Sequence, residues 1–453
     1  MIASMRRARS TWLCLTALTN CTGRGVVADV ASGDGADTDT ASTMDDDDAG
    51  TESASATGAD TTGSGGARCG DGVLDPGESC DDNNAIDGDG CSHYCVPSGS
   101  ELWAVDAELH DCNSLAIDVE GSMFVNGPPN QDFEHGAHVR RFDLDDGALL
   151  WQADYDPPEG TGNGWVVLGL RTRGGFTLAG DSEVDELSSY SPWSQTRTED
   201  GGLLSEFTRI DPKVGGLPEG FALDGTDSLW FSVQLIVDGQ LGGSQLWPVS
   251  VDGSLDAVID VDSIVFESGS AASTGPVVFR TEMQLASYGL DGELQWSQDV
   301  ADGLMSGVED VAVAPNGDIF VAMGIDKGTG ESKIVVRTYT ADGAPIGEFV
   351  HAGPDDATAY SWGGDVEVDS SGNAVVVSMI RGKDSLDDDI RLGKYTSGGQ
   401  MLWSQLFGAP DVQAGRVETC GIAIAPDDAV VIGVFTSFNG ESPQTVTLHK
   451  FAP

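Results

Sequence analysis

The sequence predicts an all-β chain whose main part is a seven-bladed β-propeller, and three observations lead to this fold class. A strand–turn–strand phrase recurs along residues 101–453, as in LAIDVEGSMFVNG from Leu115 and VAVAPNGDIFVAMG from Val311. A second phrase places an Asp-Gly turn before a tryptophan strand, as in LASYGLDGELQWSQDV from Leu285. The turn of the first phrase recurs at a mean step of about 51 residues, a spacing typical of four-stranded propeller blades.

Seven units fit this repeat, and the last unit lacks one strand. Its second phrase ends at Phe451 without a tryptophan strand, whereas the repeat region opens with ELWAVDA at Glu101, which matches MLWSQLF at Met401. We therefore expect the N-terminal strand to form the outer strand of the last blade. Such a closure leaves no unpaired strand edge at the seam between the first and last units.

The tryptophans of the second phrase are expected to pack between blades. The phrases KYTSGGQMLWSQLFG and SYGLDGELQWSQDV resemble a bacterial propeller repeat with a Leu-Trp strand, and they are also similar to the tryptophan docking repeats of quinoprotein dehydrogenases. In both families the tryptophan packs between neighbouring blades, and the resemblance implies the same role here. The residues concerned are Trp103, Trp151, Trp296 and Trp403.

Residues 1–21 look like an export signal that ends at a lipid-anchor site. Three arginines between Met1 and Arg9 precede an apolar stretch from Trp12 to Leu18, which is too short to span a membrane as a mature helix. The LTNC sequence that ends at Cys21 resembles a bacterial lipobox, which implies that this cysteine is lipidated. The threonine that follows it implies sorting to the outer membrane. We expect a cell-envelope location, as an outer-membrane lipoprotein or as a secreted protein.

Residues 22–67 are expected to be a disordered acidic linker. They consist mainly of Gly, Ala, Ser, Thr and Asp, and so few large apolar side chains cannot offset the entropy cost of ordering the segment. The whole chain is also acidic, with 22 Lys and Arg against 74 Asp and Glu and a formal charge of −52. This charge repels phosphate backbones and excludes nucleic acid as a partner.

Residues 68–97 are interpreted as a small cysteine-rich module. Cys69, Cys80, Cys91 and Cys95 lie among few large apolar residues, so disulfides must hold the segment together. Four cysteines allow three pairings, and the spacing does not select one. The pattern CGDG…GESCDD…GDGC…C resembles the cysteine-rich repeat common in myxobacterial surface proteins. The resemblance implies an extracellular setting and no reaction.

The same module offers carboxylates for calcium, which takes six to eight oxygen ligands in turn-rich loops. Its Asp-Gly-Asp-Gly run alternates carboxylates with turns but lacks the spacing and closing Glu of an EF-hand. The alternative is a run of Asp-Gly turns on an acidic surface without an ion. The candidate calcium ligands are Asp71, Asp81, Asp82, Asp87 and Asp89. No other cofactor is expected.

Two cysteines outside the module, Cys112 and Cys420, are expected to form a disulfide. Each stands shortly before the inner strand of its unit, the first and the last, and these units are neighbours across the closure. The alternative is two separately buried thiols. A bond here would close a loop of about 300 residues, which chain-entropy models associate with strong stabilisation.

No arrangement of residues indicates catalysis. The chain has no Gly-x-Ser-x-Gly elbow, and its histidines are scattered. His135 and His138 beside Glu134 are metal-ligand types, but we interpret their Gly/Pro/Asn-rich segment as a solvated loop. With 74 acidic residues, pairs of carboxylates arise by chance and do not indicate glycoside hydrolysis.

These features predict an exported, membrane-tethered surface protein whose propeller is a non-catalytic binding or scaffold module. The expected partner is an unidentified protein or glycan at the cell surface, with membrane contact only through the lipid anchor, and the protein is expected to be a monomer. Ligand contacts are expected in the longest insertions, Asn126–Ala137 and Asp181–Gly202 with Tyr190 and Trp193. The alternative is an exported enzyme, either a quinoprotein-like dehydrogenase or a glycan-active propeller.

Overall fold

The structure of the chain is a computed structural model. It describes residues 69–84, 86–118, 120–129, 137–157, 166–170, 175–183, 190–209, 214–237, 240–261, 268–271, 275–281, 283–300, 305–326, 332–352, 358–382, 388–408, 415–438 and 441–453. Over these ranges the regular elements are all β-strands. No helix that is long and apolar enough to cross a bilayer occurs among them.

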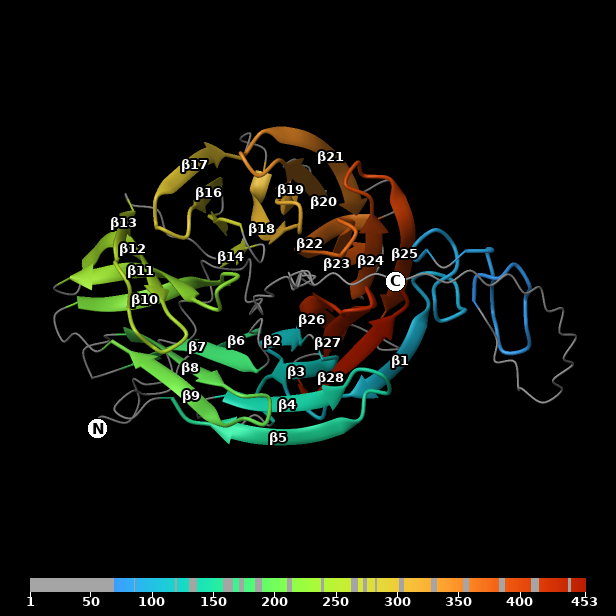
Figure 1. Cartoon of the computed structure of the whole chain (residues 1–453), viewed down its shortest axis with the longest axis horizontal. Helices are drawn as coiled ribbons and strands as arrows, with labels where there is room; N and C mark the ends of the chain where they lie inside the picture. The colour runs from blue at the N-terminus through green and yellow to red at the C-terminus, as the bar shows by residue number, and fades with distance from the viewer. Residues whose placement is uncertain are drawn as a thin grey trace, which may run out of the picture.

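Seven four-stranded antiparallel sheets surround a common centre as the blades of a propeller (Figure 1), which confirms the predicted fold class. In the first four blades the chain runs from the innermost strand outward. Blade 1 contains β2 (Ser114–Ile117), β3 (Ser122–Asn126), β4 (Ala137–Asp143) and β5 (Leu149–Tyr155). Blade 2 contains β6 (Val166–Leu170), β7 (Phe176–Glu183), β8 (Tyr190–Arg197) and β9 (Leu203–Thr208). Blade 3 contains β10 (Val214–Leu223), β11 (Leu229–Val237), β12 (Gln240–Val249) and β13 (Ile259–Val261), and blade 4 contains β14 (Ser268–Ala271), β15 (Val277–Arg280), β16 (Gln284–Tyr288) and β17 (Leu294–Asp299).

The last three blades include the closure of the ring. Blade 5 contains β18 (Met305–Val313), β19 (Ile319–Asp326), β20 (Ser332–Tyr339) and β21 (Pro345–Ala352). Blade 6 contains β22 (Thr358–Val368), β23 (Ala374–Gly382), β24 (Asp388–Tyr395) and β25 (Met401–Gly408). Blade 7 contains β26 (Gly415–Ile424), β27 (Val430–Phe438), β28 (Glu441–Phe451) and, outermost, β1 (Glu101–Asp106). The antiparallel pairing of β1 with β28, with Val105 opposite Leu448, confirms the predicted closure by the N-terminal strand.

The hydrophobic core lies between the blades because both faces of each sheet carry apolar side chains. At the seam of blades 7 and 1, for example, Leu115 and Phe142 share a buried cluster with Val431 and Leu448. Other clusters join blades 1 and 2, blades 4 and 5, blades 5 and 6, and blades 6 and 7, and a larger one spans blades 2 to 4. Each blade is therefore stabilised by its neighbours, as in other repeat folds.

A glycine with positive φ sits in the turn between the third and fourth strands and lies against the outer strand of the preceding blade. Gly343 (φ 83°) lies against Trp296 in this way, and a Cβ atom at this position would crowd the indole ring. Blade 7 has no continuous turn here, because its third and fourth strands come from opposite ends of the chain. Gly99 (φ 77°) takes the equivalent place against Trp403. Its N–H donates to the carbonyl of Ala452 at 3.0 Å, so the closing turn is built from two separate segments.

Candidate functional site: a variable propeller face and a docked cysteine-rich module

The two faces of the propeller carry different connections. On one face, the turns that follow the first and third strands of the blades have four to nine residues, and five is the rule. On the other face, the connections that follow the second and fourth strands vary from two to ten residues. We call these the uniform face and the variable face. Ligand-binding residues of a scaffold concentrate in connections that vary while the framework stays constant, so the variable face is the candidate interaction face.

Turns of the uniform face are built around aspartate side chains that accept backbone N–H groups. In blade 6, Asp369 accepts hydrogen bonds from the N–H groups of Ser371 and Asn373. The same carboxylate lies 2.9 Å from the ammonium of Lys394 on β24, and both side chains are almost fully buried (1% and 2% exposed). Asp369 and Lys394 therefore tie this turn to the third strand of the same blade.

Blade 7 departs from this arrangement, because Ala425 stands where blade 6 has Asp369. Lys450 on β28 corresponds to Lys394, since each faces the outer-strand tryptophan of its blade, and its side chain is 2% exposed. An ammonium buried without a partner costs several kcal/mol. Lys450 finds partners outside its own sheet: it donates to the hydroxyl of Tyr94 at 3.0 Å and to the carbonyl of Leu144 at 3.3 Å.

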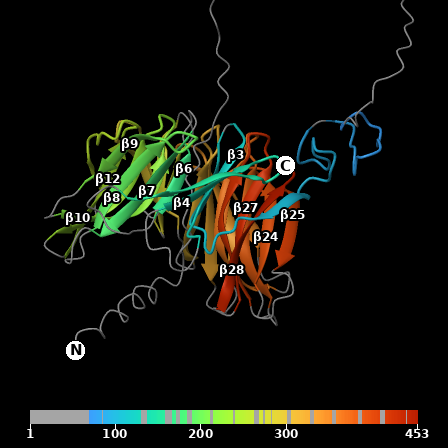
Figure 2. The same ribbon diagram turned by 90° about the horizontal axis from the view of Figure 1, so that it is seen from below.

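Tyr94 belongs to the cysteine-rich module, so this contact docks the module on the propeller. Its hydroxyl donates to the carboxylate of Asp427, in the turn between β26 and β27, and the ammonium of Lys450 lies 3.8 Å from the same carboxylate. Burial, together with the hydrogen bond to Asp427, raises the pKa of Tyr94, so the phenol stays protonated and can donate. Figures 1 and 2 show the module outside the ring, beside β1 and β25. Sequence reasoning missed this contact, because Tyr94 and Lys450 are distant in the chain.

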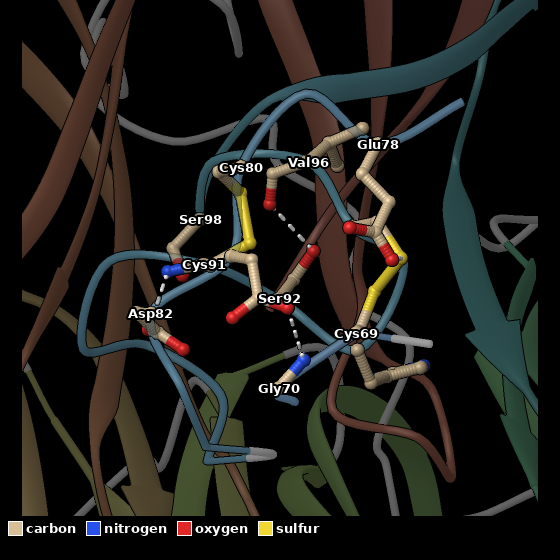
Figure 3. The surroundings of a disulfide bond; sticks show 12 residues. Cys69, Gly70, Glu78, Cys80, Asp82, Cys91, Ser92, Val96 and Ser98 are labelled. Atoms are coloured by element: carbon tan, nitrogen blue, oxygen red, sulfur yellow. Dashed lines mark hydrogen bonds between the residues drawn. A yellow bond between two sulfur atoms is a disulfide. The ribbon is translucent and has the colours of Figure 1, made fainter. Parts of the chain in front are cut away.

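Two disulfides hold the module together, Cys69–Cys95 and Cys80–Cys91 (Figure 3). This is one of the three pairings that the spacing left open. Ser92 adds a hydrogen bond from its hydroxyl to the carbonyl of Val96 at 2.8 Å. The module needs these ties because Val73, Leu74 and Ile86 are all exposed and contribute no core.

The candidate calcium ligands serve mainly as acceptors for N–H groups within the module. Asp81 accepts from the N–H groups of Gly70, Asp71, Gly72 and Asn83. The other acceptor pairs are Asp71 with Val73 N–H, Asp82 with Cys91 N–H, Asp87 with His93 N–H, and Asp89 with the Asn84 amide. Among the described residues, the group of three ligand atoms within 4.8 Å is Cys69, Glu78 and Cys95, and two of these atoms are disulfide sulfurs. Four of these carboxylates accept backbone N–H groups, and Asp89 accepts the side-chain amide of Asn84, so these hydrogen bonds all lie within the module.

Replacing Asp81 by asparagine is expected to open the loop around it, because an amide has one acceptor oxygen where the carboxylate has two. Hydrogen exchange at Gly70, Gly72 and Asn83 should become faster, whereas Asp89→Asn should leave it unchanged. The hydrogen bond from Asn83 N–H, with those from Gly72, Gly70 and Asp71, lowers the pKa of Asp81 from 3.8. The folded form therefore binds fewer protons, and acid should open the wild-type loop only as the pH falls below about 4. Equal exchange rates in both variants would contradict this role.

Cys112 and Cys420 are joined by a disulfide across the seam of blades 1 and 7. It continues a series of links between the inner strands of successive blades. These links are Ser270 Oγ with Val313 N at 3.3 Å, Asp310 Oδ2 with Val366 N at 3.0 Å, and Asp365 Oδ2 with Thr419 Oγ1 at 3.4 Å. At the seam of blades 7 and 1 a covalent bond thus stands where the three preceding seams have hydrogen bonds.

The four outer-strand tryptophans all lie at seams between blades. The indole N–H of Trp103 donates to the carbonyl of Leu144 in blade 1, at 3.0 Å. Trp296 in blade 4 donates in the same way to Ala341 in blade 5, at 2.9 Å. Trp151 packs on the core between blades 1 and 2, and Trp403 lies in the core between blades 6 and 7. Each of these indoles therefore contacts the neighbouring blade as well as its own.

Three residues expected in loops, His138, Tyr190 and Trp193, lie in strands, and the interpretation of these two segments was wrong. His138 is in β4 and 6% exposed; its Nδ1 lies 2.5 Å from Asp154 on β5, and its Nε2 accepts from Arg140. Trp193 is in β8 and fully buried. In both cases polar residues and glycines around the strand hid its alternation. His135 and Glu134 lie outside the described residues, as do the signal segment with Cys21 and the linker.

His351 is a second buried histidine, at the end of β21. Its Nδ1 lies 3.0 Å from the hydroxyl of Tyr395, and its Nε2 lies 3.3 Å from the carbonyl of Arg391. Burial, together with the nearby charge of Arg391, lowers the pKa of His351 to about 3. The unfolded chain therefore takes up a proton that the folded chain refuses.

This proton uptake predicts a pH-dependent loss of stability. Unfolded His351 titrates near 6.5, so the free energy of unfolding should fall as the pH drops from about 6.5 towards 3. His351→Gln, which keeps polar contacts but cannot titrate, should show a shallower decline in urea midpoint over this range. His93→Gln, at the more exposed histidine of the module, serves as the control. Parallel curves for wild type and His351→Gln would refute the prediction.

No protein-family model matches the chain, and no curated protein matches it. Several solved structures are similar in part. The WD40 domain of Neurospora crassa Pan2 has 9% identity, covers 82% of this chain and 97% of its own, and gives a TM-score of 0.47. YCF48 bound to a D1 peptide has 12% identity, covers 78% and 96%, and gives 0.45. A Bacteroides caccae protein of unknown function has 12% identity, covers 53% and 81%, and gives 0.37. At these identities and TM-scores, the similarities do not indicate a function for this chain.

Proposed function

We propose that this chain is an exported protein tethered at the cell surface through Cys21, and that its propeller binds a protein or glycan on the variable face without catalysing a reaction. The contrast between uniform and variable connections carries the binding part of the proposal. One face is fixed by repeated turns, whereas the other presents connections of different lengths at one end of a rigid ring. A constant framework with connections of different lengths on one face is typical of scaffolds that bind through loops.

Export is supported by the state of the cysteines. All six cysteines among the described residues are in disulfides, and such bonds persist in oxidising compartments outside the cytosol. A non-catalytic role is supported by two of the three described histidines that contact carboxylates. His138 pairs with Asp154 and His449 with Glu101, each across neighbouring strands of one blade, which is a structural arrangement.

The binding proposal is tested by screening the full chain against glycans and cell-envelope proteins, followed by two matched variants. Met283 and Leu290 stand at opposite ends of β16 in blade 4 and are 50% and 46% exposed. Met283 lies on the variable face and Leu290 on the uniform face. Met283→Glu should weaken binding of an identified ligand that covers blade 4, whereas Leu290→Glu should not. A ligand that responds only to Leu290→Glu would place the site on the wrong face.

Tethering and the absence of catalysis have separate tests. Radiolabelled palmitate should enter the wild-type protein and fail to enter Cys21→Ser, which should then be released from the cells. Labelling of both proteins, or of neither, would remove the anchor. Turnover of a glycan panel, or a coloured cofactor that copurifies with the chain, would favour the alternative function, an exported enzyme, over a binding module.

A further inference from the structure

We infer that the outer strand of blade 6, β25, is an interaction edge through which two copies of this chain pair. The outermost strand of every blade has one edge without a partner in its sheet. Such edges invite pairing with other chains, and proteins commonly guard them with charged side chains. The question is which of the seven edges is left unguarded.

Six of the seven outer strands carry at least one carboxylate. These are Glu101 and Asp106 in β1, Asp154 in β5, Glu206 in β9, Asp260 in β13, Asp299 in β17 and Glu348 in β21. β25 reads MLWSQLFG and carries no charge, and no Asp, Glu, Lys or Arg occurs between Lys394 and Asp411. In a chain with a formal charge of −52, this makes β25 unlike every other outer strand.

The register identifies the position where the charge is missing. Trp103, Trp151 and Trp296 are each followed three residues later by an aspartate. On the neighbouring strand, the residue opposite this aspartate lies three positions before the residue opposite the tryptophan. Trp403 of β25 is followed at the same register by Leu406, which faces Arg391 and is 61% exposed. Of the four blades with a tryptophan on the outer strand, blades 1, 4 and 7 have a solvated aspartate at this register. Blade 6 has an exposed leucine there instead.

The cysteine-rich module leaves this part of β25 uncovered. Gly88 and Gly99 lie against Leu402 and Trp403, at the beginning of the strand. Leu406, further along, remains exposed. In Figure 1 the module lies beside β25 on the outside of the ring. An antiparallel pair of β25 strands centred near Leu406 would place the two modules at opposite ends.

The charge pattern identifies the partner as a second copy of the chain. A basic partner would gain most at the edges that carry carboxylates and would have no preference for β25. An uncharged edge favours pairing with a surface that is itself acidic, because like charges that face each other across paired strands are destabilising. A second copy is equally acidic everywhere else and offers the same uncharged strand. This inference differs from the expectation of a monomer.

The test is sedimentation velocity of the full chain, with ~0.15 M salt to screen the net charge. We expect the mass to rise with concentration from that of one chain towards twice that value. Leu406→Asp restores the residue found at this register in blades 1, 4 and 7, so it is compatible with the fold. It should raise the dissociation constant at least about tenfold, through like charges placed across the pair.

The matched control is Val350→Asp on β21, which stands at the same register in blade 5 and is 51% exposed. It should leave the dissociation constant unchanged, since β21 already carries Glu348. A wild-type chain that stays monomeric at its highest soluble concentration would overturn the inference. Equal effects of Leu406→Asp and Val350→Asp would also overturn it. No ligand is involved in this experiment, so its outcome is independent of the binding test.

Discussion

Replacing Cys112 and Cys420 together by serine is expected to lower the free energy of unfolding of the propeller by about 5 kcal/mol in the chain-entropy account. The reason is the length of the loop that this bond closes. The two cysteines are 308 residues apart, so the disulfide removes far more freedom from the unfolded chain than a local bond does. Without it, the seam of blades 7 and 1 depends on the pairing of β1 with β28 and on the apolar core beneath it.

The measurement is urea unfolding followed by tryptophan fluorescence under non-reducing conditions. The matched control is the double serine variant of Cys80 and Cys91, whose bond spans 11 residues inside the module. It should destabilise the module and leave the unfolding midpoint of the propeller nearly unchanged. Coincident midpoints for wild type and the Cys112/Cys420 variant would show that the strand closure alone sets the stability of the ring.

The ring itself could be predicted from the sequence because its determinants are local and repeated. Each blade needs alternating apolar residues, a tight turn and a glycine that tolerates positive φ, and all three recur at a nearly constant spacing. The closure could be predicted for the same reason: the segment around Trp103 repeats the pattern around Trp403. His138 and Trp193 escaped this logic because their strands lie beside irregular segments in which polar residues mask the alternation.

The docking of the module could not be predicted, because it depends on exceptions to the repeat. Ala425 removes the carboxylate that would pair with Lys450, and the substitute partners come from another domain and from blade 1. A repeat pattern reveals what the blades share. The contacts that distinguish one blade become visible only in the folded chain. It shows that Lys450 lacks the carboxylate found in blade 6, and that Leu406 on β25 stands where other blades have an aspartate.

Weakening the contact between Tyr94 and Lys450 is expected to release the module from the propeller. Tyr94→Phe removes the hydroxyl that accepts from Lys450 and donates to Asp427, and leaves a buried ammonium with fewer partners. We expect a loss of about 2 kcal/mol in the free energy of unfolding, within the range for a buried charged hydrogen bond. Proteolysis in the segment between Pro97 and Glu101 should also become faster, because this segment joins the module to β1.

A double-mutant cycle separates this contact from general damage to the seam. Lys450→Met keeps an unbranched side chain of similar length without the charge. If Tyr94 and Lys450 act as a pair, the double variant should lose about 1–3 kcal/mol less than the sum of the single variants. Glu101→Gln provides the control, since the pair of Glu101 with His449 is partly exposed and should contribute well under 1 kcal/mol. Strict additivity of Tyr94→Phe and Lys450→Met would mean that the module rests on the ring without being held by it, and the buried lysine would then depend on Leu144 and Asp427 alone.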